Sequence, residues 1–337
     1  MHIVAMQKVN AKKVAELAGV SRSAVSRSFS GNGRVSAETR AKVFAASEQL
    51  GYRPNGLASS LARQTSDIVA LINGDAPDFR EVFFVQNLSR ALFNAGMTPL
   101  MLSVRNDDSG AETLSQFLRF PLLTAVVSAD SIEARHVIPH CPYAPPIMLN
   151  ENYSRDDEVD AVRLDEVKGI GEMVAHLEST GRKTLWFIAG RQTTSAYSSR
   201  KMALLEALAR SDLRLLDSEV GDFFYDSGTA AFERLYQRGP LPDAIFCAND
   251  LMAMGVMDTA RFKYGLRVPE DLYVVGFDDI PQSSWPTYAL PSIQQRDADI
   301  INAILEILTE RKEGAGDQRL SKMVPTRFVP RTKAEFA

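Results

Sequence analysis

The chain has 337 residues, of which 45% are hydrophobic and 24% are charged, so it can form more than one hydrophobic core. No apolar run approaches the ~18 residues that a membrane span needs, and the start MHIVAMQKVN is too short and weakly charged for a secretory signal. The two cysteines, Cys141 and Cys247, lie far apart, which argues against a disulfide framework and favours a reducing cytoplasm.

Charge is distributed unevenly along the chain. Residues 1–66 carry ten lysines and arginines against three acids, a net charge of +7, although the whole chain has a net charge of −4. The remaining residues therefore carry −11. A basic head on an acidic body is typical of a small nucleic-acid-binding module joined to a domain that stays off DNA.

Two short helices joined by a tight turn are predicted in the stretch VAELAGVSRSAVSRSF, residues 14–29. Val14, Leu17 and Ala18 recur on one face of the first helix, and Gly19 ends it. Ser21 can cap the second helix through its hydroxyl. The second helix has an apolar face of Ala24, Val25 and Phe29, and polar side chains point elsewhere. The pattern indicates a helix-turn-helix, whose second helix fits the DNA major groove, although a plain helical hairpin has the same pattern.

A third helix is predicted between Ser36, a good N-cap with an acid in the first turn after it, and Gly51, where a helix stops. Tyr52-Arg53-Pro54-Asn55 leads from it into residues 56–63, which are too few and too polar to form a stable isolated helix.

The rest of the chain alternates short apolar runs with amphipathic stretches, which predicts parallel sheets with helices on both faces. About 270 residues exceed one typical core, so two sheets are expected. The predicted strands are Ile68–Ile72, Pro99–Ser103, Ala125–Ala129, Ile147–Asn150, Leu185–Gly190, Ala244–Ala248 and Tyr273–Phe277. The predicted helices include Phe84–Ala95, Val167–Leu177, Arg200–Ala209, Thr229–Gln237 and Leu251–Tyr264.

Polar residues follow several predicted strands, where ligands bind in such folds. They are Asn73 after the first strand, Asn249-Asp250 after AIFCA, and Asp278-Asp279 after VVGF. Adjacent positions on an extended strand face opposite ways, so the paired aspartates do not converge on one substrate atom. Helix capping or a structural ion pair is the alternative role for these two acids.

Motifs for catalysis and metal binding are weak. His136, His140 and Cys141 have metal-ligand spacing only if they are helical, and Pro139 and Pro142 break that helix. No GxSxG, P-loop, GxGxxG or HExxH motif occurs, so we expect no cofactor, no metal and no enzymatic activity.

The head contains the ordered set AGVSRSAVSR, GNGRVSAETR and LGYRPNGLASSLAR over about 55 residues. By this set the head resembles the lactose-repressor (LacI) family of bacterial transcription regulators. This resemblance implies a homodimer on a near-palindromic operator, with the second helix in the major groove and paired hinge helices in the minor groove.

The resemblance also implies roles for single residues. Arg22 and Ser23 face base edges, where an arginine discriminates guanine by about 1–3 kcal/mol; a phosphate contact or a solvated charge is the alternative for Arg22. Leu61 is the wedge that kinks the duplex, with a buried core position as its alternative. The other implied DNA-binding residues, which hold phosphates, orient the helix or lie along the minor groove, are Asn10, Ser21, Ser26, Arg27, Arg34, Asn55 and Ala58.

The body resembles the effector-binding core of the same family, similar to periplasmic sugar-binding proteins with two lobes joined by three crossing strands. CANDLMAMG, GLRVPEDLYVVGFDD and the terminal FVPRT carry this resemblance. It implies effector contacts from Arg200, Phe223, Asn249 and Asp278, which suit a polyol because each hydroxyl needs both a donor and an acceptor. A plain core position is the alternative for Phe223. Asn73 is a further candidate.

The first core helix opens with Arg80 and Glu81, where the family often has two aromatic residues. This alignment predicts a charged cavity mouth and an anionic effector, such as a sugar acid, bound by Arg80. Unchanged affinity for every anionic ligand in Arg80→Ala would disprove the assignment.

The sequence therefore predicts an all-α helix-turn-helix domain (1–54), a hinge (55–66) and an α/β core of two doubly wound parallel-sheet lobes (67–337). The amino-terminal lobe comprises about 67–164 plus 296–326, and the carboxyl-terminal lobe about 165–295 plus the tail. The expected protein is a cytoplasmic, nucleoid-associated dimeric repressor whose operator affinity is gated by a small-molecule effector, with no membrane partner. The alternatives are an activator, a co-repressor-dependent regulator, a sugar-binding receptor and an enzyme. No leucine heptad follows Phe328, which favours a dimer over a tetramer.

Overall fold

A computed structural model of the chain describes residues 10–30, 35–53, 66–74, 79–105, 107, 109–118, 121–149, 158–316 and 318–331. The chain divides into two compact units, Met1–Ser66 and Asp67–Ala337, which we call the head and the core. Most of the predicted hinge, with Asn55, Ala58 and Leu61, lies outside the described residues, as does Arg34. No helix among the described residues is both long and apolar enough to cross a membrane.

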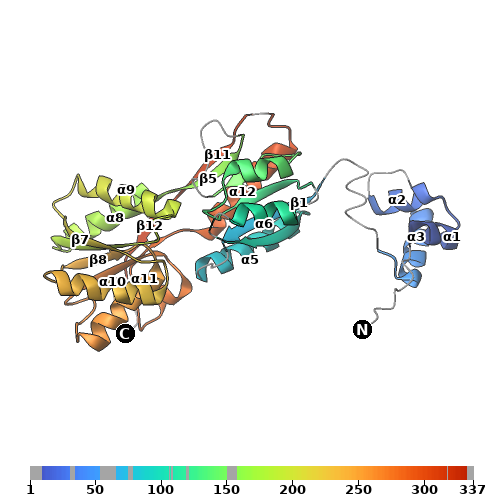
Figure 1. Cartoon of the computed structure of the whole chain (residues 1–337). Helices are drawn as coiled ribbons and strands as arrows, with labels where there is room; N and C mark the ends of the chain where they lie inside the picture. Colours follow the sequence, from blue (N-terminus) through green and yellow to red (C-terminus); the bar gives the residue numbers. More distant parts are fainter. Residues whose placement is uncertain are drawn as a thin grey trace. The chain divides into compact units, whose positions relative to one another are not determined.

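The head contains three helices, α1 (Ala11–Ala18), α2 (Arg22–Ser30) and α3 (Ala37–Leu50), in its described part (Figure 1). The predicted helix boundaries are confirmed by their caps. The Ser21 hydroxyl accepts a hydrogen bond from the Ala24 N–H at 3.2 Å, and the Ser36 hydroxyl accepts one from the Thr39 N–H at 3.1 Å. Gly19 and Gly51 end α1 and α3 with φ of 64° and 62°, a left-handed conformation that glycine adopts without steric cost.

The buried face of α1 differs from the prediction at one position. Val14 and Ala15 are buried, together with Val25 of α2 and Val43 of α3, whereas Leu17 is 47% exposed. Because α1 packs against both α2 and α3, its buried face is centred between Val14 and Ala15, and Leu17 lies outside it.

Two six-stranded sheets form the core, which confirms the predicted fold class. The sheet of the amino-terminal lobe has the order β11-β5-β4-β3-β1-β2, and all its strands run parallel. Its strands are β1 (Ile68–Gly74), β2 (Thr98–Val104), β3 (Thr124–Val127), β4 (Ile147–Met148), β5 (Asp160–Asp165) and β11 (Ser321–Pro325). Ile68 pairs with Thr98, and Val126 pairs with Ile147.

Helices cover both faces of this sheet. Val69 and Leu71 of β1 pack on one face with α5 (Phe79–Asn94) and α12 (Asp297–Lys312). Ala70 and Ile72 pack on the other face with α6 (Ser109–Phe117) and α7 (Ala134–Val137). Side chains alternate between the faces of a strand, so β1 is buried along its whole length.

The carboxyl-terminal lobe has the strand order β12-β10-β9-β8-β6-β7, with only β12 antiparallel among these strands. Its strands are β6 (Thr184–Ala189), β7 (Arg214–Val220), β8 (Ala244–Cys247), β9 (Tyr273–Asp278), β10 (Ser292–Gln294) and β12 (Arg327–Val329). Its helices are α8 (Glu166–Ser179), α9 (Ser195–Leu208), α10 (Tyr225–Arg238) and α11 (Asp250–Asp258), the last continued by a π-helical turn, Thr259–Lys263. Figure 1 shows α8 and α9 on one side of the sheet and α10 and α11 on the other.

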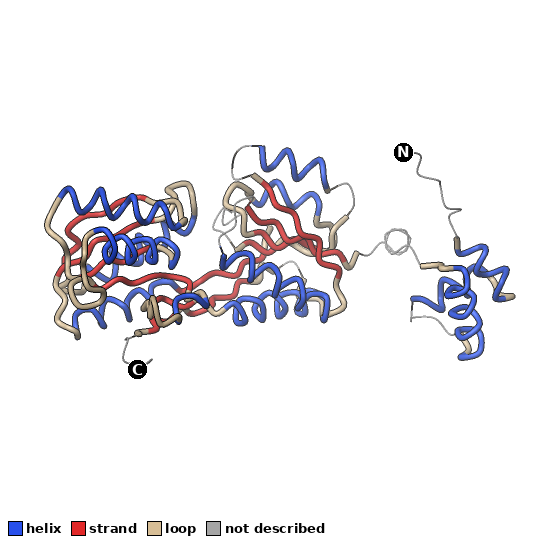
Figure 2. The backbone as a smooth tube through the Cα atoms, turned by 90° about the horizontal axis from the view of Figure 1, so that it is seen from below, coloured by secondary structure: helices blue, strands red, loops and turns tan. Residues whose placement is uncertain are grey.

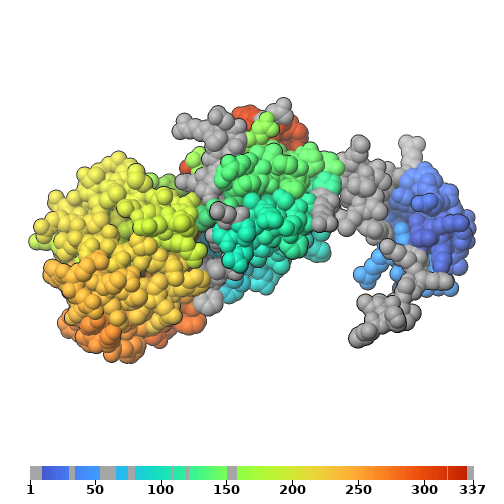
Figure 3. Space-filling view, in the orientation of Figure 1, coloured from blue at the N-terminus to red at the C-terminus, as the bar shows by residue number. Residues whose placement is uncertain are grey.

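Three segments pass from one lobe to the other (Figure 2): β5 into α8, β10 into α12, and β11 into β12. In the space-filling view the two lobes are distinct masses that touch each other, one mainly green to cyan and one mainly yellow to orange (Figure 3). All seven predicted strands are present, but β5, β7, β10, β11 and β12 were not predicted. These five are short, carry charges, or alternate exposed and part-buried residues, as β7 does, so none is a continuous apolar run.

Candidate functional site

A cavity of about 250 Å³ lies in the core and is lined by residues from both lobes. Its lining residues follow the carboxyl ends of parallel strands, where polar loops and helix starts meet in doubly wound folds. Ser128 and Asp130 follow β3, Arg191 follows β6, Asp222 follows β7, and Asp278 ends β9.

Arg200 of α9 is the centre of a buried charged cluster in this cavity. Its Nε donates to Glu166 Oε1 at 3.2 Å, and its Nη2 lies 3.7 Å from Asp278 Oδ1. Its Nη1 donates to the Ala248 carbonyl, and the guanidinium carbon lies 3.8 Å from the centre of the Phe277 ring. A guanidinium with this many partners has one fixed orientation, so Arg200 presents Asp278 and Glu166 to the cavity at defined positions.

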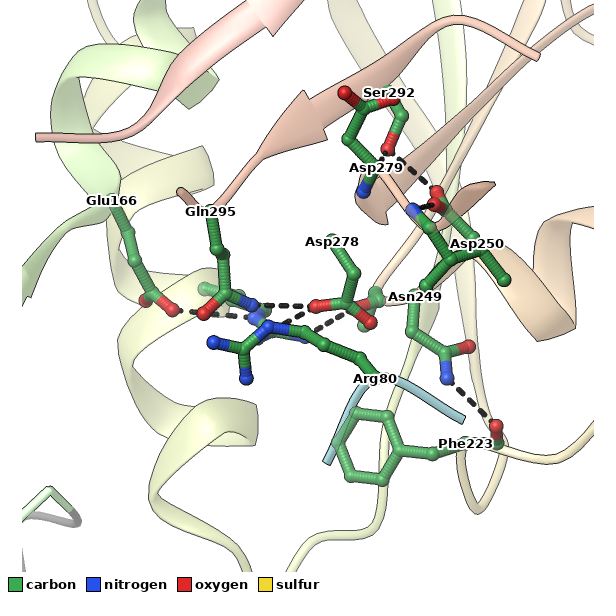
Figure 4. A network of polar contacts seen from close by, with 12 residues as sticks. Arg80, Glu166, Phe223, Asn249, Asp250, Asp278, Asp279, Ser292 and Gln295 are labelled. Carbon is green, nitrogen blue, oxygen red and sulfur yellow. Dashed lines mark hydrogen bonds and ion pairs between the residues drawn. The ribbon is translucent and has the colours of Figure 1, made fainter. Parts of the chain in front are cut away.

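Gln295 completes this cluster from the segment that connects β10 to α12. Its Nε2 donates to Asp278 Oδ1 at 2.5 Å, and Figure 4 shows Glu166, Gln295 and Asp278 along one side of the site. Glu166 begins α8 directly after β5, so two of the three crossing segments supply a cavity residue. A change in lobe orientation therefore alters this cluster.

Phe223 also lines the cavity, from the loop between β7 and α10, with a φ of 74°. A left-handed φ is strained for a residue with a Cβ, and such strain persists only where neighbours impose it. Asn249 is one of those neighbours, because its Nδ2 donates to the Phe223 carbonyl at 2.7 Å. Gly190 is another, because a Cβ at that position would collide with the Phe223 ring.

The adjacent Asp278 and Asp279 point in opposite directions, as predicted. Asp278 faces the cavity, whereas Asp279 Oδ1 pairs with Arg331 at 2.5 Å and its Oδ2 accepts from Gln294 at 2.6 Å. Asp279 thus has the structural ion pair that the sequence left open.

Asp250, at the start of α11, lies behind this strand end and is fully buried. Its carboxylate accepts hydrogen bonds from the Ile280 N–H at 2.8 Å, from Ser283 Oγ at 2.7 Å and from Ser292 Oγ at 2.6 Å (Figure 4). Burial raises the pKa of Asp250 to about 7, although these hydrogen bonds oppose the shift. Asp250 holds the segment after Asp279 against α11.

Arg80 and Glu81 begin α5 and line the cavity. Arg80 Nη2 pairs with Asp297 Oδ1 at 2.9 Å, and its guanidinium lies 5.5 Å from the centre of the Phe84 ring. Glu81 Oε1 accepts a hydrogen bond from Ser128 Oγ at 2.8 Å. An acid of the protein itself therefore already partners Arg80.

Two predicted effector residues do not line the cavity. Asn73 lies inside β1, not after it, and its amide donates to the Gly74 carbonyl and to Ser103 Oγ. Asn249 caps α11 by accepting from the Met252 N–H at 3.0 Å and acts on the site through the Phe223 carbonyl. Arg80, Arg200, Phe223 and Asp278 do line it.

Several lining residues were not predicted, including Glu166, Gln295, Arg191, Asp130 and Ser195. Glu166 and Gln295 follow β5 and β10, two strands that were not predicted, whereas Asp130 and Arg191 follow β3 and β6, which were predicted, so the rule that found Asp278 already applied to them. Ser195 was missed because α9 begins at Ser195, five residues before the predicted start.

In the head, α2 has an exposed polar face. Ser21, Arg22, Ser23, Ser26 and Arg27 are exposed, and Val25 and Ser28 point into the head. Arg27 folds back onto Ser23, where its Nε donates to the carbonyl at 3.2 Å and its Nη2 to Oγ at 3.1 Å. The Arg22 side chain makes no hydrogen bond, ion pair or ring contact with any described residue. Asn10 caps α1 by accepting from the N–H groups of Lys12 and Lys13, each at 3.1 Å.

Comparison with known proteins agrees with both units. Residues 11–55 match the family model described as bacterial regulatory proteins, lacI family, and residues 174–332 match the periplasmic binding protein-like domain. The chain is 30% identical to catabolite control protein A of Priestia megaterium over 305 residues, 88% of this chain and 90% of that protein.

Solved structures agree as well. A lac repressor dimer bound to operator and the anti-inducer ONPF is 25% identical, with a TM-score of 0.83, over 97% of this chain and 99% of that chain. A complex of the transcriptional regulator CelR with cellobiose is 26% identical, with a TM-score of 0.67, over 96% and 99%. This protein belongs to the LacI family of bacterial regulatory proteins.

Proposed function

We propose that the protein is a sequence-specific DNA-binding transcriptional regulator, specifically a repressor, whose operator affinity is set by a small molecule in the core cavity. The observation that carries this proposal is the combination in one chain of a helix-turn-helix head with an exposed α2 and a polar cavity lined by both lobes. One similar structure is a lac repressor dimer bound to operator DNA, and another is a complex of the regulator CelR with the sugar cellobiose.

On DNA, α2 enters the major groove. Arg22, whose exposed side chain makes no hydrogen bond or ion pair within the described residues, reads a base edge, and Ser23 assists it. Asn10, Ser21, Ser26 and Arg27 contact phosphates or orient the helix. Arg34, and the hinge residues Asn55, Ala58 and Leu61, are assigned from the sequence pattern alone, with Leu61 as the minor-groove wedge.

In the cavity, the effector stacks on the Phe223 ring. Its hydroxyl groups form hydrogen bonds with the cluster around Arg200, which includes Asp278 and Gln295. Each hydroxyl of a polyol donates and accepts, so a carboxylate beside a guanidinium and an amide meets both needs. Asn249 and Gly190 act indirectly, by holding Phe223 in place.

Effector binding and operator binding are coupled through the relative orientation of the two lobes. The coupling needed is modest, because a thousand-fold change in operator affinity corresponds to about 4 kcal/mol. A homodimer acting in the cytoplasm at the nucleoid fits this role, since each head then reads one half of a near-palindromic site. No chemical step is assigned to the cavity.

The test is selection of bound DNA from a random pool with the full-length protein, followed by anisotropy titration at several salt concentrations. We expect a near-palindromic site with a flexible central step, steep salt dependence, and a large loss of affinity in Leu61→Ala. Absence of any enriched site would contradict the DNA-binding function. Conversion of a ligand that raises the melting temperature would favour an enzyme instead.

A further inference from the structure

Nine charged side chains line the cavity, and they differ in how fully their hydrogen-bonding groups are used. They are Arg80, Arg163, Arg191 and Arg200, with Glu81, Asp130, Glu166, Asp222 and Asp278. These residues include positive and negative charges, so the net charge of the cavity alone does not indicate which ligand it binds. The decisive property is which of these groups already has a partner.

Every lining carboxylate accepts a hydrogen bond from the protein. Glu81 accepts from Ser128 Oγ at 2.8 Å, Asp130 accepts from the N–H of Ser195 at 3.0 Å, and Asp222 accepts from the N–H of Phe224 at 3.0 Å. Glu166 and Asp278 are held by the Arg200 guanidinium, and Gln295 also donates to Asp278.

Two of the four arginines are also in use. Arg200 has the partners described above, and Arg80 pairs with Asp297 at 2.9 Å. Arg163 and Arg191 differ from them, because neither side chain makes a hydrogen bond, ion pair or ring contact with any other residue in the described part of the chain. Among the nine charged side chains of the cavity, the two without such a partner in the described part of the chain are therefore both hydrogen-bond donors.

Arg163 and Arg191 come from different lobes. Arg163 is an exposed residue of β5 in the amino-terminal lobe, and Arg191 is part-buried directly after β6 in the carboxyl-terminal lobe. A guanidinium presents five N–H groups in a planar fork that matches a carboxylate or a phosphate. A neutral hydroxyl satisfies this fork less well, because it offers no charge and no bidentate pair of acceptors.

We propose that the effector of this protein is a small polyol that carries an acid group, a carboxylate or a phosphate, and that Arg191 and Arg163 bind this acid group. The proposal rests on the proposed function for the use of the core cavity as the effector site. It moves the anion-binding role from Arg80, whose charge is balanced by Asp297, to two arginines that the sequence did not single out. Because these arginines lie on opposite lobes, the acid group also favours one lobe orientation over another.

The experiment uses the full-length protein and matched probes: D-glucose, D-gluconate, D-glucuronate, D-glucose 6-phosphate and the corresponding D-galactose series. Melting temperature is measured first, and calorimetric titration then gives the affinity of each probe that raises it. We expect at least one acid to raise the melting temperature while its neutral parent does not. The carboxylates and the phosphates are separate arms, so the experiment decides between these two acid groups.

Variants then test the two arginines. Arg191→Gln and Arg163→Gln each weaken binding of the acid by about 10-fold or more, since each removes a charge-assisted contact. Arg210→Gln is the matched control, because Arg210 is an exposed residue just after α9 that pairs with Glu206 outside the cavity, and it leaves the affinity unchanged.

Failure of this proposal is distinguishable from failure of the proposed function. If a neutral sugar binds with equal affinity in wild type and both variants and releases the selected operator, the regulator stands and the acid-group proposal is wrong. The same proposal is wrong if no acid of the panel raises the melting temperature. If an acid binds as expected but never alters affinity for the selected operator, the acid-binding site stands and effector-gated regulation is wrong.

Discussion

Asp130 of the amino-terminal lobe accepts two hydrogen bonds from Ser195, the first residue of α9 in the other lobe. The backbone N–H of Ser195 lies 3.0 Å from Asp130 Oδ1, and its hydroxyl lies 2.8 Å from the same atom. A carboxylate at a helix N-terminus is favoured by the helix dipole and by the N–H groups that have no partner within the helix. This contact therefore joins the lobes directly across the cavity.

We expect Asp130→Ala to shift the protein toward a more open arrangement of the lobes. Hydrogen bonds to a charged group contribute about 1.5–3 kcal/mol each, so the equilibrium changes by roughly ten-fold or more. Small-angle scattering of the isolated protein detects the change as a larger radius of gyration without effector. Asp212→Ala, at an exposed position, is the control; an unchanged radius of gyration in Asp130→Ala contradicts the inter-lobe role.

Gly190→Ala is expected to abolish effector binding while operator binding is retained. A Cβ at Gly190 would collide with the Phe223 ring, which is held on the other side by the hydrogen bond from Asn249 to the Phe223 carbonyl. The ring must leave its place, and the stacking surface is lost. Calorimetric titration with the effector and anisotropy with the operator measure the two effects. Gly239→Ala, where a Cβ meets open space, is the control and binds effector normally.

Arg22→Ala and Arg27→Ala are expected to weaken DNA binding in different ways. The Arg22 side chain makes no hydrogen bond or ion pair within the described residues, so its removal weakens operator binding by about 1–3 kcal/mol and relaxes base preference at one position. The Arg27 side chain is hydrogen-bonded to Ser23, so its removal weakens binding to all DNA sequences similarly. It also lowers the slope of log affinity against log salt concentration by about one. Selection of DNA from a random pool and anisotropy titration at several salt concentrations, each with both variants, measure these effects. An unaltered base preference in Arg22→Ala would mean that Arg22 contacts a phosphate and not a base.

Asp250→Asn is expected to change how stability depends on pH. Burial raises the pKa of Asp250 from 3.8 to about 7 in the folded protein. Between about pH 4 and 7 the folded state therefore binds more protons than the unfolded state, so this residue lowers the free energy of unfolding as pH rises. The slope is at most about 1.4 kcal/mol per pH unit.

Denaturant unfolding of wild type and Asp250→Asn at pH 5, 6 and 7 measures this difference. The variant lacks the Asp250 contribution, so the free-energy difference between the two proteins varies with pH. Parallel pH profiles for wild type and Asp250→Asn would mean that Asp250 does not titrate in this range.

Much of the architecture can be predicted from local sequence patterns. Gly19, Ser21, Ser36 and Gly51 determine helix ends in the head through backbone conformation and capping, which depend only on neighbouring residues. Six of the seven predicted strands are apolar because both faces of a parallel sheet are covered, and this burial is visible in the sequence itself; β2, at the sheet edge, has exposed positions. Asp278 was found because polar side chains follow strand ends, and Phe223 was found through the family resemblance.

The tertiary structure alone determined how the cavity residues are partnered. Asn73 lies near the end of β1 and Asn249 follows β8, yet the amides of both residues bind main-chain and hydroxyl groups of the protein and not the cavity. Arg80 pairs with Asp297, 217 residues away in the chain, whereas Arg191 remains available in the cavity. Local sequence determines whether a residue lies in a helix or near a strand end, but the availability of its charge depends on distant residues that only folding brings into contact.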